Sequence, residues 1–295
     1  MMRGTIIFLL CVTLAVSGLA IFTQKVFAEA KKAIVVVSFG TSYADTRKAT
    51  IEACEKKIQA TFPDYEVHRA FTSNIIIKIL KERDNILVDT PEEALQRLQD
   101  GGFSEVIVQP LHVIPGAEFH DLLSVVRKYE KAFETLQVGT PLLTTIHDYM
   151  AVADALTGQL PDLKDQEAVA FMGHGTHHPA NATYALLERV LEDKGMKRIF
   201  VGTVEGYPAF EQVLTRLQDN NIEKVTLMPF MLVAGDHAQN DMAGDEEDSW
   251  KTMLKKEGLV VESYLHGLGE NPAIQDIYLQ HIEEAMKGES EALSL

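Results

Sequence analysis

The chain contains only two cysteines in 295 residues, Cys11 and Cys54. Cys11 lies in an apolar segment at the N-terminus, and removal of that segment would leave Cys54 without an intrachain partner. A disulfide framework therefore does not support this fold. Ile51, Cys54 and Ile58 would share one face of a helix, which predicts that Cys54 is a buried core thiol.

Basic residues are scarce relative to acidic ones, with 27 Lys and Arg against 43 Asp and Glu. The formal net charge is −16, and it becomes −18 without residues 1–28, which carry Arg3 and Lys25 but no acidic residue. Such a surface repels nucleic acids and anionic lipids, so we expect neither as a partner. The sequence also lacks a G-x-G-x-x-G or P-loop motif, which argues against a nucleotide cofactor.

Residues 1–28 have the pattern of an export signal. Arg3 is followed by the uncharged run GTIIFLLCVTLAVSGLAIFTQ, and small residues precede the expected cleavage site after Ala28. This pattern predicts a periplasmic protein with no stable membrane anchor after cleavage. The alternative is an uncleaved anchor, because the apolar run approaches the roughly 20 residues that span a bilayer.

Apolar, β-branched runs alternate with helical patterns along the rest of the chain. Strands are expected at 33–38 and near 66–72, 105–111, 137–144, 168–173, 199–204, 224–232 and 259–265. Helices are expected from about 42 to 62 and near 74–83, 91–100, 117–134, 147–158, 181–194, 208–220, 239–256 and 271–287. Regular alternation predicts an α/β fold in which parallel four-stranded sheets carry helices on both faces.

An internal repeat predicts two related halves, residues 29–150 and 151–295. Residues 95–100 (LQRLQD) match 214–219 (LTRLQD), and 33–41 align with 168–176. The carboxyl ends of the strands would face a cleft between the halves. The C-terminal helix could pack back on the first half.

The aligned halves differ at three positions that each follow a predicted strand. His174 stands opposite Phe39, Glu205 opposite Phe71, and His237 opposite Glu118. Two imidazoles and a carboxylate at one rim form a donor set suited to Co²⁺, Fe²⁺, Ni²⁺ or Zn²⁺. The repeat therefore predicts a metal site in the second half.

Several neighbouring residues are candidates for roles near this site. A carboxylate beside a ligand histidine orients it, which makes Asp236 and Asp241 candidates for that role. His177 and His178 offer a rival cluster or are solvated loop residues. The other candidates, which follow strands of the first half and could face a ligand, are Ser38, Gly40, Thr41, His112 and Glu118.

Six segments resemble the anaerobic sirohydrochlorin cobaltochelatases. They are SFGTSYADTR at 38–47, RAFTS at 69–73, MGHGTHH at 172–178, VGTVEGYP at 201–208, LMPFMLVAGDHAQNDMAGDEEDSWK at 227–251 and GLGENPAI at 267–274. The resemblance implies a ferrochelatase-like fold of two flavodoxin-like halves around a tetrapyrrole cleft. It also implies ATP-independent insertion of Co²⁺, and in some relatives Fe²⁺, into sirohydrochlorin in early cobalamin synthesis.

By the same resemblance, the metal ligands and catalytic residues fall on His174, Glu205 and His237, with His174 also accepting a proton. Arg47, Arg69 or Lys78 could balance the carboxylates of the tetrapyrrole. We expect a homo-oligomer, and His120 could ligate haem at a subunit contact. The usual family member is cytoplasmic, whereas this chain carries an export pattern.

Two other functions remain open from the sequence. The first is an exported metal or haem carrier on a chelatase-derived fold, for which the signal peptide is the main argument. The second is a zinc hydrolase that uses His174, His177 and His178. Sirohydrochlorin turnover with Co²⁺ would separate the chelatase from both.

Overall fold

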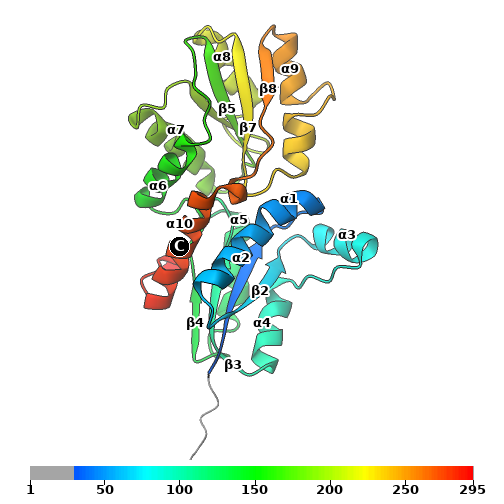
Figure 1. The fold of residues 1–295 in the computed structure, drawn as a ribbon, viewed down its shortest axis with the longest axis vertical. Helices are drawn as coiled ribbons and strands as arrows, with labels where there is room; N and C mark the ends of the chain where they lie inside the picture. The colour runs from blue at the N-terminus through cyan, green and yellow to red at the C-terminus, as the bar shows by residue number, and fades with distance from the viewer. Residues whose placement is uncertain (1–29, 295) are drawn as a thin grey trace, which may run out of the picture. The chain divides into compact units, whose positions relative to one another are not determined.

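The computed structural model describes residues 30–294, and the predicted signal peptide lies outside this range. The described residues form two four-stranded sheets in which all strands are parallel (Figure 1). The first sheet has the order β2-β1-β3-β4 and the second the order β6-β5-β7-β8. The strands are β1 Lys31–Ser38, β2 Glu66–Phe71, β3 Phe103–Pro110, β4 Thr135–Val138, β5 Glu167–Gly173, β6 Ile199–Thr203, β7 Lys224–Phe230 and β8 Val260–Ser263. The shared strand order agrees with the internal repeat, and the predicted α/β fold is confirmed.

Helices cover both faces of each sheet because the central strands are apolar on both sides. In β1, Ile34 and Val36 join one apolar cluster, whereas Ala33, Val35 and Val37 join another on the opposite face. The α-helices are α1 Ala44–Ala49, α2 Ile51–Thr61, α3 Asn74–Asp84, α4 Pro91–Asp100, α5 Ala117–Arg127, α6 Ile146–Thr157, α7 Thr183–Asp193, α8 Phe210–Asp219, α9 Trp250–Lys256 and α10 Pro272–Lys287.

Four elements differ from those predicted. The helix expected from about 42 to 62 is divided at Thr50 into α1 and α2. The strand expected near 137–144 is β4, which ends at Val138 because the chain then leaves the sheet toward α6. The helix expected at 117–134 ends at Arg127. The helix expected at 239–256 is divided into the π-helix η2 (Ala238–Met242) and α9, whose new start is capped by the Ser249 side chain.

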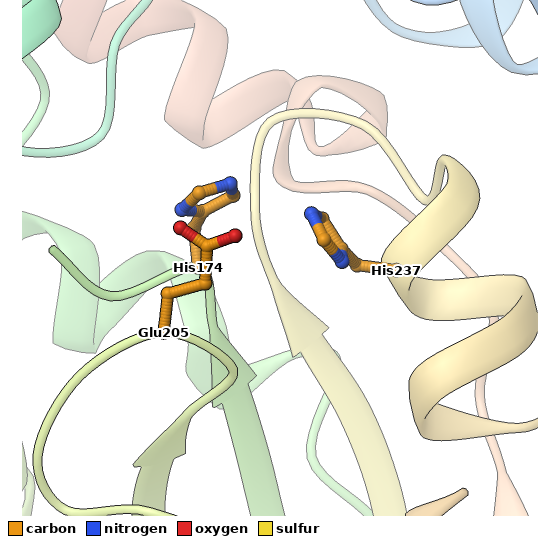
Figure 2. A group of neighbouring side chains, drawn as sticks. All are labelled: His174, Glu205 and His237. Carbon is orange, nitrogen blue, oxygen red and sulfur yellow. The ribbon is translucent and has the colours of Figure 1, made fainter.

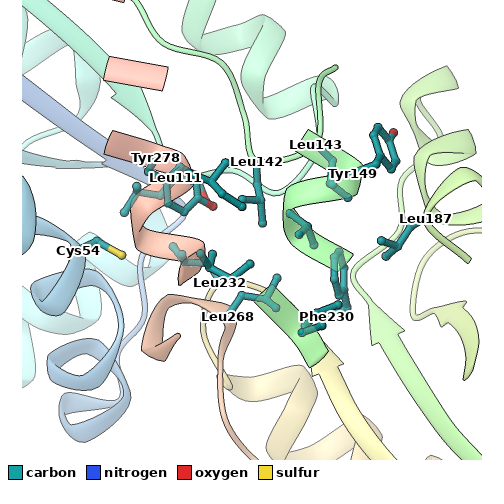
Figure 3. Packing of buried hydrophobic residues seen from close by; sticks show 14 of the residues in the cluster. Cys54, Leu111, Leu142, Leu143, Tyr149, Leu187, Phe230, Leu232, Leu268 and Tyr278 are labelled. Atoms are coloured by element: carbon teal, nitrogen blue, oxygen red, sulfur yellow. The ribbon is translucent and has the colours of Figure 1, made fainter. Parts of the chain in front are cut away.

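The largest apolar cluster contains residues from both halves (Figure 3). α10 packs against β3, β4 and α2 of the first half and against α6. The buried Tyr278 hydroxyl donates a hydrogen bond of 3.0 Å to the Leu111 carbonyl. Residues from Lys31 onward consequently form one compact unit. None of the helices in the described part of the chain has both the length and the hydropathy of a membrane span.

A buried polar pair holds α10 to α6. His281 Nε2 lies 3.0 Å from Asp148 Oδ1, and His281 Nδ1 lies 3.1 Å from the Thr140 carbonyl. Asp148 also accepts hydrogen bonds from the backbone N–H groups of Thr144 and Thr145. Burial raises the pKa of Asp148, but His281 and the backbone donors outweigh it and hold the pKa below its usual 3.8. The pair therefore joins α10 to the segment that connects the two halves.

We expect Asp148→Asn to lower the free energy of unfolding near neutral pH by about 3–5 kcal/mol, because it leaves His281 buried without its carboxylate. A lowered pKa in the folded state stabilises the protein above the unfolded pKa, and this contribution is lost as pH falls through the folded value. In urea unfolding, the difference in the free energy of unfolding between the wild type and Asp148→Asn should therefore shrink below about pH 4. A difference under about 1 kcal/mol would contradict this role for the pair.

Candidate metal centre

Three side chains with metal-binding atoms follow neighbouring strands of the second sheet. His174 comes directly after β5, Glu205 follows β6, and His237 lies between β7 and η2. Because β6, β5 and β7 are parallel neighbours, their carboxyl ends meet at one edge. One ligand atom from each residue lies within 4.8 Å of the others, and Figure 2 shows the side chains converging. The structure brings together the three residues that the repeat comparison singled out.

Two glycines allow the close packing around His174. A Cβ on Gly173 would lie 2.3 Å from the Tyr184 ring, and one on Gly175 would lie 2.7 Å from the Gly206 backbone nitrogen. Gly175 also has φ +83°, a conformation that favours glycine. The loop that contains Glu205 can therefore approach closely, and the Glu205 backbone N–H donates a 2.8 Å hydrogen bond to the His174 carbonyl.

Hydrogen bonds orient both imidazole rings. His174 Nδ1 lies 2.9 Å from the Gly175 carbonyl, and His237 Nδ1 lies 2.6 Å from Asp241 Oδ2. Since both partners are acceptors, each Nδ1 carries a proton and each neutral ring has a lone pair on Nε2. The predicted orienting role of a nearby carboxylate thus fits Asp241. Asp236 instead contacts Tyr43 and Asn240.

The three donors are open to solvent. His174 and His237 are half-buried and Glu205 is exposed. The set has one carboxylate and two neutral nitrogens, so a divalent ion would keep a net positive charge. Ligands of this kind and number leave positions free for water or a substrate, as in catalytic rather than structural metal sites.

The donors open into a cleft of about 780 Å³ that is lined by both halves. The first half contributes the loop after β1, which includes Phe39, and part of α3, which includes Ile75 and Ile79. The second half contributes His174, Glu205 and His237 together with residues 230–233. The metal-binding atoms therefore face a largely apolar cavity.

His112 and Glu118 line the opposite wall of the cleft. His112 Nε2 lies 3.4 Å from Glu118 Oε2. The imidazole is largely buried, and neither of its nitrogens has a hydrogen-bond partner. Burial raises the pKa of Glu118, but His112 outweighs this and holds the pKa below its usual 4.5. Glu118 is consequently ionised near neutral pH.

The three candidates in the loop after β1 have different positions. Gly40 and Thr41 line the cleft. Gly40 has φ +93°, and a Cβ there would lie 2.4 Å from the Phe71 ring, so packing within the first half requires glycine. Ser38 is buried at the end of β1 and is not among the lining residues, so the structure does not place its hydroxyl against a ligand in the cleft.

The histidines near the cleft mouth do not form the rival metal cluster. Within residues 30–294, the one group of three potential ligands consists of His174, Glu205 and His237. The zinc-hydrolase arrangement with His177 and His178 is therefore not observed. The His178 ring packs instead on His120 from the first half, with ring centroids 4.7 Å apart. His120 Nδ1 lies 2.9 Å from the Gly116 carbonyl.

The cations proposed to balance substrate carboxylates do not line the cleft. Arg47 is buried beside Glu52 and Thr41, and Arg69 pairs with Glu55. Lys78 is exposed and lies 4.0 Å from Glu82 along α3. Of the described residues that do line the cleft, none is lysine or arginine. The prediction for Arg47 and Arg69 is wrong because internal carboxylates already balance both charges.

Sequence reasoning did not identify the apolar wall from α3. The run Ile75-Ile76-Ile77 contained a signal, since a helix cannot bury three consecutive residues on one narrow face. Only Leu80 of α3 is fully buried, whereas Ile75 is 72% exposed. Large exposed apolar side chains beside a cleft are typical of a ligand-binding surface.

Comparisons with known proteins agree with this geometry. The model of the cobalt chelatase (CbiK) family matches residues 32–287. The chain is 44% identical over 256 residues to sirohydrochlorin cobaltochelatase of Salmonella typhimurium, covering 87% of this chain and 97% of the relative. It is 35% identical over 263 residues to sirohydrochlorin cobaltochelatase CbiKC of Nitratidesulfovibrio vulgaris, covering 87% and 91%.

The fold is also similar to that of a solved structure. SirB from Bacillus subtilis, determined with Fe³⁺, has a TM-score of 0.61 at 18% identity and covers 88% of this chain and 97% of its own. At that identity the likeness concerns the fold alone. The family match and the two sequence relatives span nearly all of the described residues. The chain therefore belongs to the cobalt chelatase (CbiK) family.

Proposed function

We propose that this protein inserts Co²⁺ into sirohydrochlorin without a nucleotide cofactor. The observation that carries the proposal is the group of three metal-binding side chains at the edge of a two-walled apolar cleft, in a chain of the cobalt chelatase family. Two relatives that cover most of the chain are sirohydrochlorin cobaltochelatases. A flat macrocycle between the walls would present its ring nitrogens to the donors.

His174 and His237 hold Co²⁺ through Nε2, and Glu205 supplies an oxygen ligand. Imidazole and carboxylate donors suit divalent cobalt, and the same set suits Fe²⁺, which is a second candidate metal. Three ligands bind more weakly than a closed site with four, so the ion can pass to the four nitrogens of the macrocycle. Glu205 offsets part of the metal charge before this transfer.

Insertion replaces two pyrrole N–H protons with one divalent ion, so two protons must leave the macrocycle. His174 accepts one through Nε2 once this nitrogen releases the metal. Glu118 lies on the opposite wall, is ionised near neutral pH and can accept the second. Bases on both walls would allow one proton to leave by the face from which the metal enters and the other by the opposite face.

The apolar walls bind the faces of the ring, and the peripheral carboxylates remain near solvent. Phe39 and Ile75 are among the most exposed large apolar side chains on the described residues, and burying them under a macrocycle would stabilise the complex. Since the lining residues include no lysine or arginine, the carboxylates gain little inside the cleft. His112 lines the cleft beside Glu118, but both of its ring nitrogens are buried, so its role there is to support Glu118.

Export to the periplasm is a further part of the proposal, and it is supported by the composition of residues 1–28. The homo-oligomer and the haem at His120 stay predictions. The same signal-peptide pattern supports a second candidate function, an exported metal or haem carrier. Multiple turnovers of sirohydrochlorin per chain would favour the enzyme, whereas stoichiometric binding without turnover would favour the carrier.

His174→Ala and His237→Ala should each lower the rate of Co²⁺ insertion by at least about 100-fold, because each substitution removes a metal ligand. His174→Ala also removes a base. The rate is measured from the absorbance change of sirohydrochlorin as it is metallated. His147→Ala is the matched control, since this histidine is exposed on α6 outside the cleft. Unchanged rates in both ligand variants would contradict the assignment of the metal centre.

Glu118→Gln and Glu205→Gln should separate the proton acceptor from the metal ligand. We expect Glu205→Gln to weaken Co²⁺ binding in the absence of tetrapyrrole by about tenfold or more, because the amide donates no charge to the ion. Glu118→Gln should leave Co²⁺ affinity unchanged and lower kcat by about 100-fold. Calorimetric titration and steady-state kinetics measure the two effects, and the reverse pattern would exchange the roles.

A further inference from the structure

A hydrogen bond crosses the cleft beside the metal centre. The Tyr43 hydroxyl donates to Asp236 Oδ1 at 3.1 Å, and the two residues are 193 positions apart in the chain. Tyr43 belongs to the loop after β1 in the first half, and Asp236 directly precedes His237 in the second. Both residues line the cleft. The two loops also pack closely, because a Cβ on Gly235 would lie only 3.7 Å from Thr41 Oγ1.

The first half anchors Tyr43 firmly. Its backbone N–H donates to Thr41 Oγ1 at 3.2 Å, and its carbonyl accepts from the Arg47 N–H at 2.9 Å. Burial and the contact with Asp236 raise the pKa of the phenol, so Tyr43 remains a neutral donor under ordinary conditions. Tyr43 thus presents a fixed hydrogen-bond donor to the opposite loop.

The side-chain hydrogen bonds of Asp236 and His237 are otherwise local to the second half. Asp236 Oδ1 accepts from Asn240 Nδ2 at 2.9 Å, and His237 Nδ1 contacts Asp241. Both contacts lie within the same short segment, which buried Ala234, Ala238 and Met242 hold to the core of the second half. The side-chain bond from Tyr43 connects this segment to the first half.

We propose that Tyr43 is a positioning residue that acts through Asp236 to hold His237 at the metal centre. This inference rests on the proposed role of His237 as a metal ligand. It makes the metal centre depend on both halves, although all three ligands belong to the second. Metal binding is then complete only when the loop after β1 occupies its observed place at the cleft.

The inference is tested by titrating Co²⁺ into the full protein without tetrapyrrole. Tyr43→Phe keeps the ring and removes the hydroxyl, and we expect about a tenfold loss of Co²⁺ affinity, as for other groups that orient metal ligands. Asp236→Ala should have a similar effect. Asp236→Asn retains an oxygen that accepts the Tyr43 hydrogen bond and should keep most of the affinity. Tyr129→Phe is the control, since its hydroxyl contacts Glu92 and Gln96 within the first half.

Two further measurements separate positioning from a contact with the macrocycle or a general loss of stability. The double variant Tyr43→Phe/Asp236→Ala should lose no more affinity than Asp236→Ala alone, because Asp236→Ala already removes the bond from Tyr43. In steady-state assays Tyr43→Phe should raise the KM for Co²⁺, leave the KM for sirohydrochlorin unchanged and recover its rate at saturating Co²⁺. Its melting temperature should equal that of the Tyr129→Phe control.

Wild-type Co²⁺ affinity in Tyr43→Phe, additive losses in the double variant, or a rise in the sirohydrochlorin KM alone would overturn the inference. These outcomes leave the proposed function intact. Conversely, a wild-type protein that binds Co²⁺ but does not metallate sirohydrochlorin would contradict the proposed function and not the role of Tyr43.

Discussion

Parallel pairing of β6, β5 and β7 is the constraint on which the candidate metal centre depends. In a parallel sheet all carboxyl ends lie at one edge, so residues that follow three neighbouring strands meet even when they are distant in sequence. His174, Glu205 and His237 span more than sixty positions and still bring ligand atoms within 4.8 Å of one another. The glycines beside His174 allow the loop after β6 to come close enough for this contact.

The two halves share a strand order but present different chemistry to the cleft. The second half supplies the three potential metal ligands, whereas the first supplies apolar side chains and the pair of His112 and Glu118. Such a division suits the insertion of an ion into a flat ring, because the ion can enter from the second half while Glu118 accepts a proton at the opposite face. The shared apolar cluster and α10 hold the halves in one unit, so the width of the cleft is set by packing rather than by a linker.

Sequence reasoning was strongest where a local pattern repeats. The apolar runs at 33–38 and 168–173 predicted strands, and the aligned halves identified the three rim positions. It was weaker where a terminus depends on contacts with other elements. β4 ends at Val138 because the chain turns toward α6, and the segment after His237 is divided by η2 and the Ser249 cap. No local period in the sequence reveals either event.

The predicted roles of charged residues were limited in the same way, because they also depend on contacts with other elements. The residue types near the first strands suggested that Arg47 and Arg69 could serve a ligand, yet each side chain lies beside a carboxylate of α2 in the folded protein. Sequence spacing alone could not predict these ion pairs, because Arg69 is on β2 and its partners are on a preceding helix. His177 and His178 likewise lie near His174 in sequence but belong to the cleft mouth rather than to the ligand group.

By itself, the sequence determined the fold class, the duplication, the family resemblance and the identity of the three donors, because strand periodicity and internal repeats are local properties. Only the tertiary structure decided which face each donor presents, which charges are already paired, and that Tyr43 reaches Asp236 across 193 positions. These features depend on the distances between segments that pack together only in the folded chain. Such distances are set by the shared core and not by any single stretch of sequence.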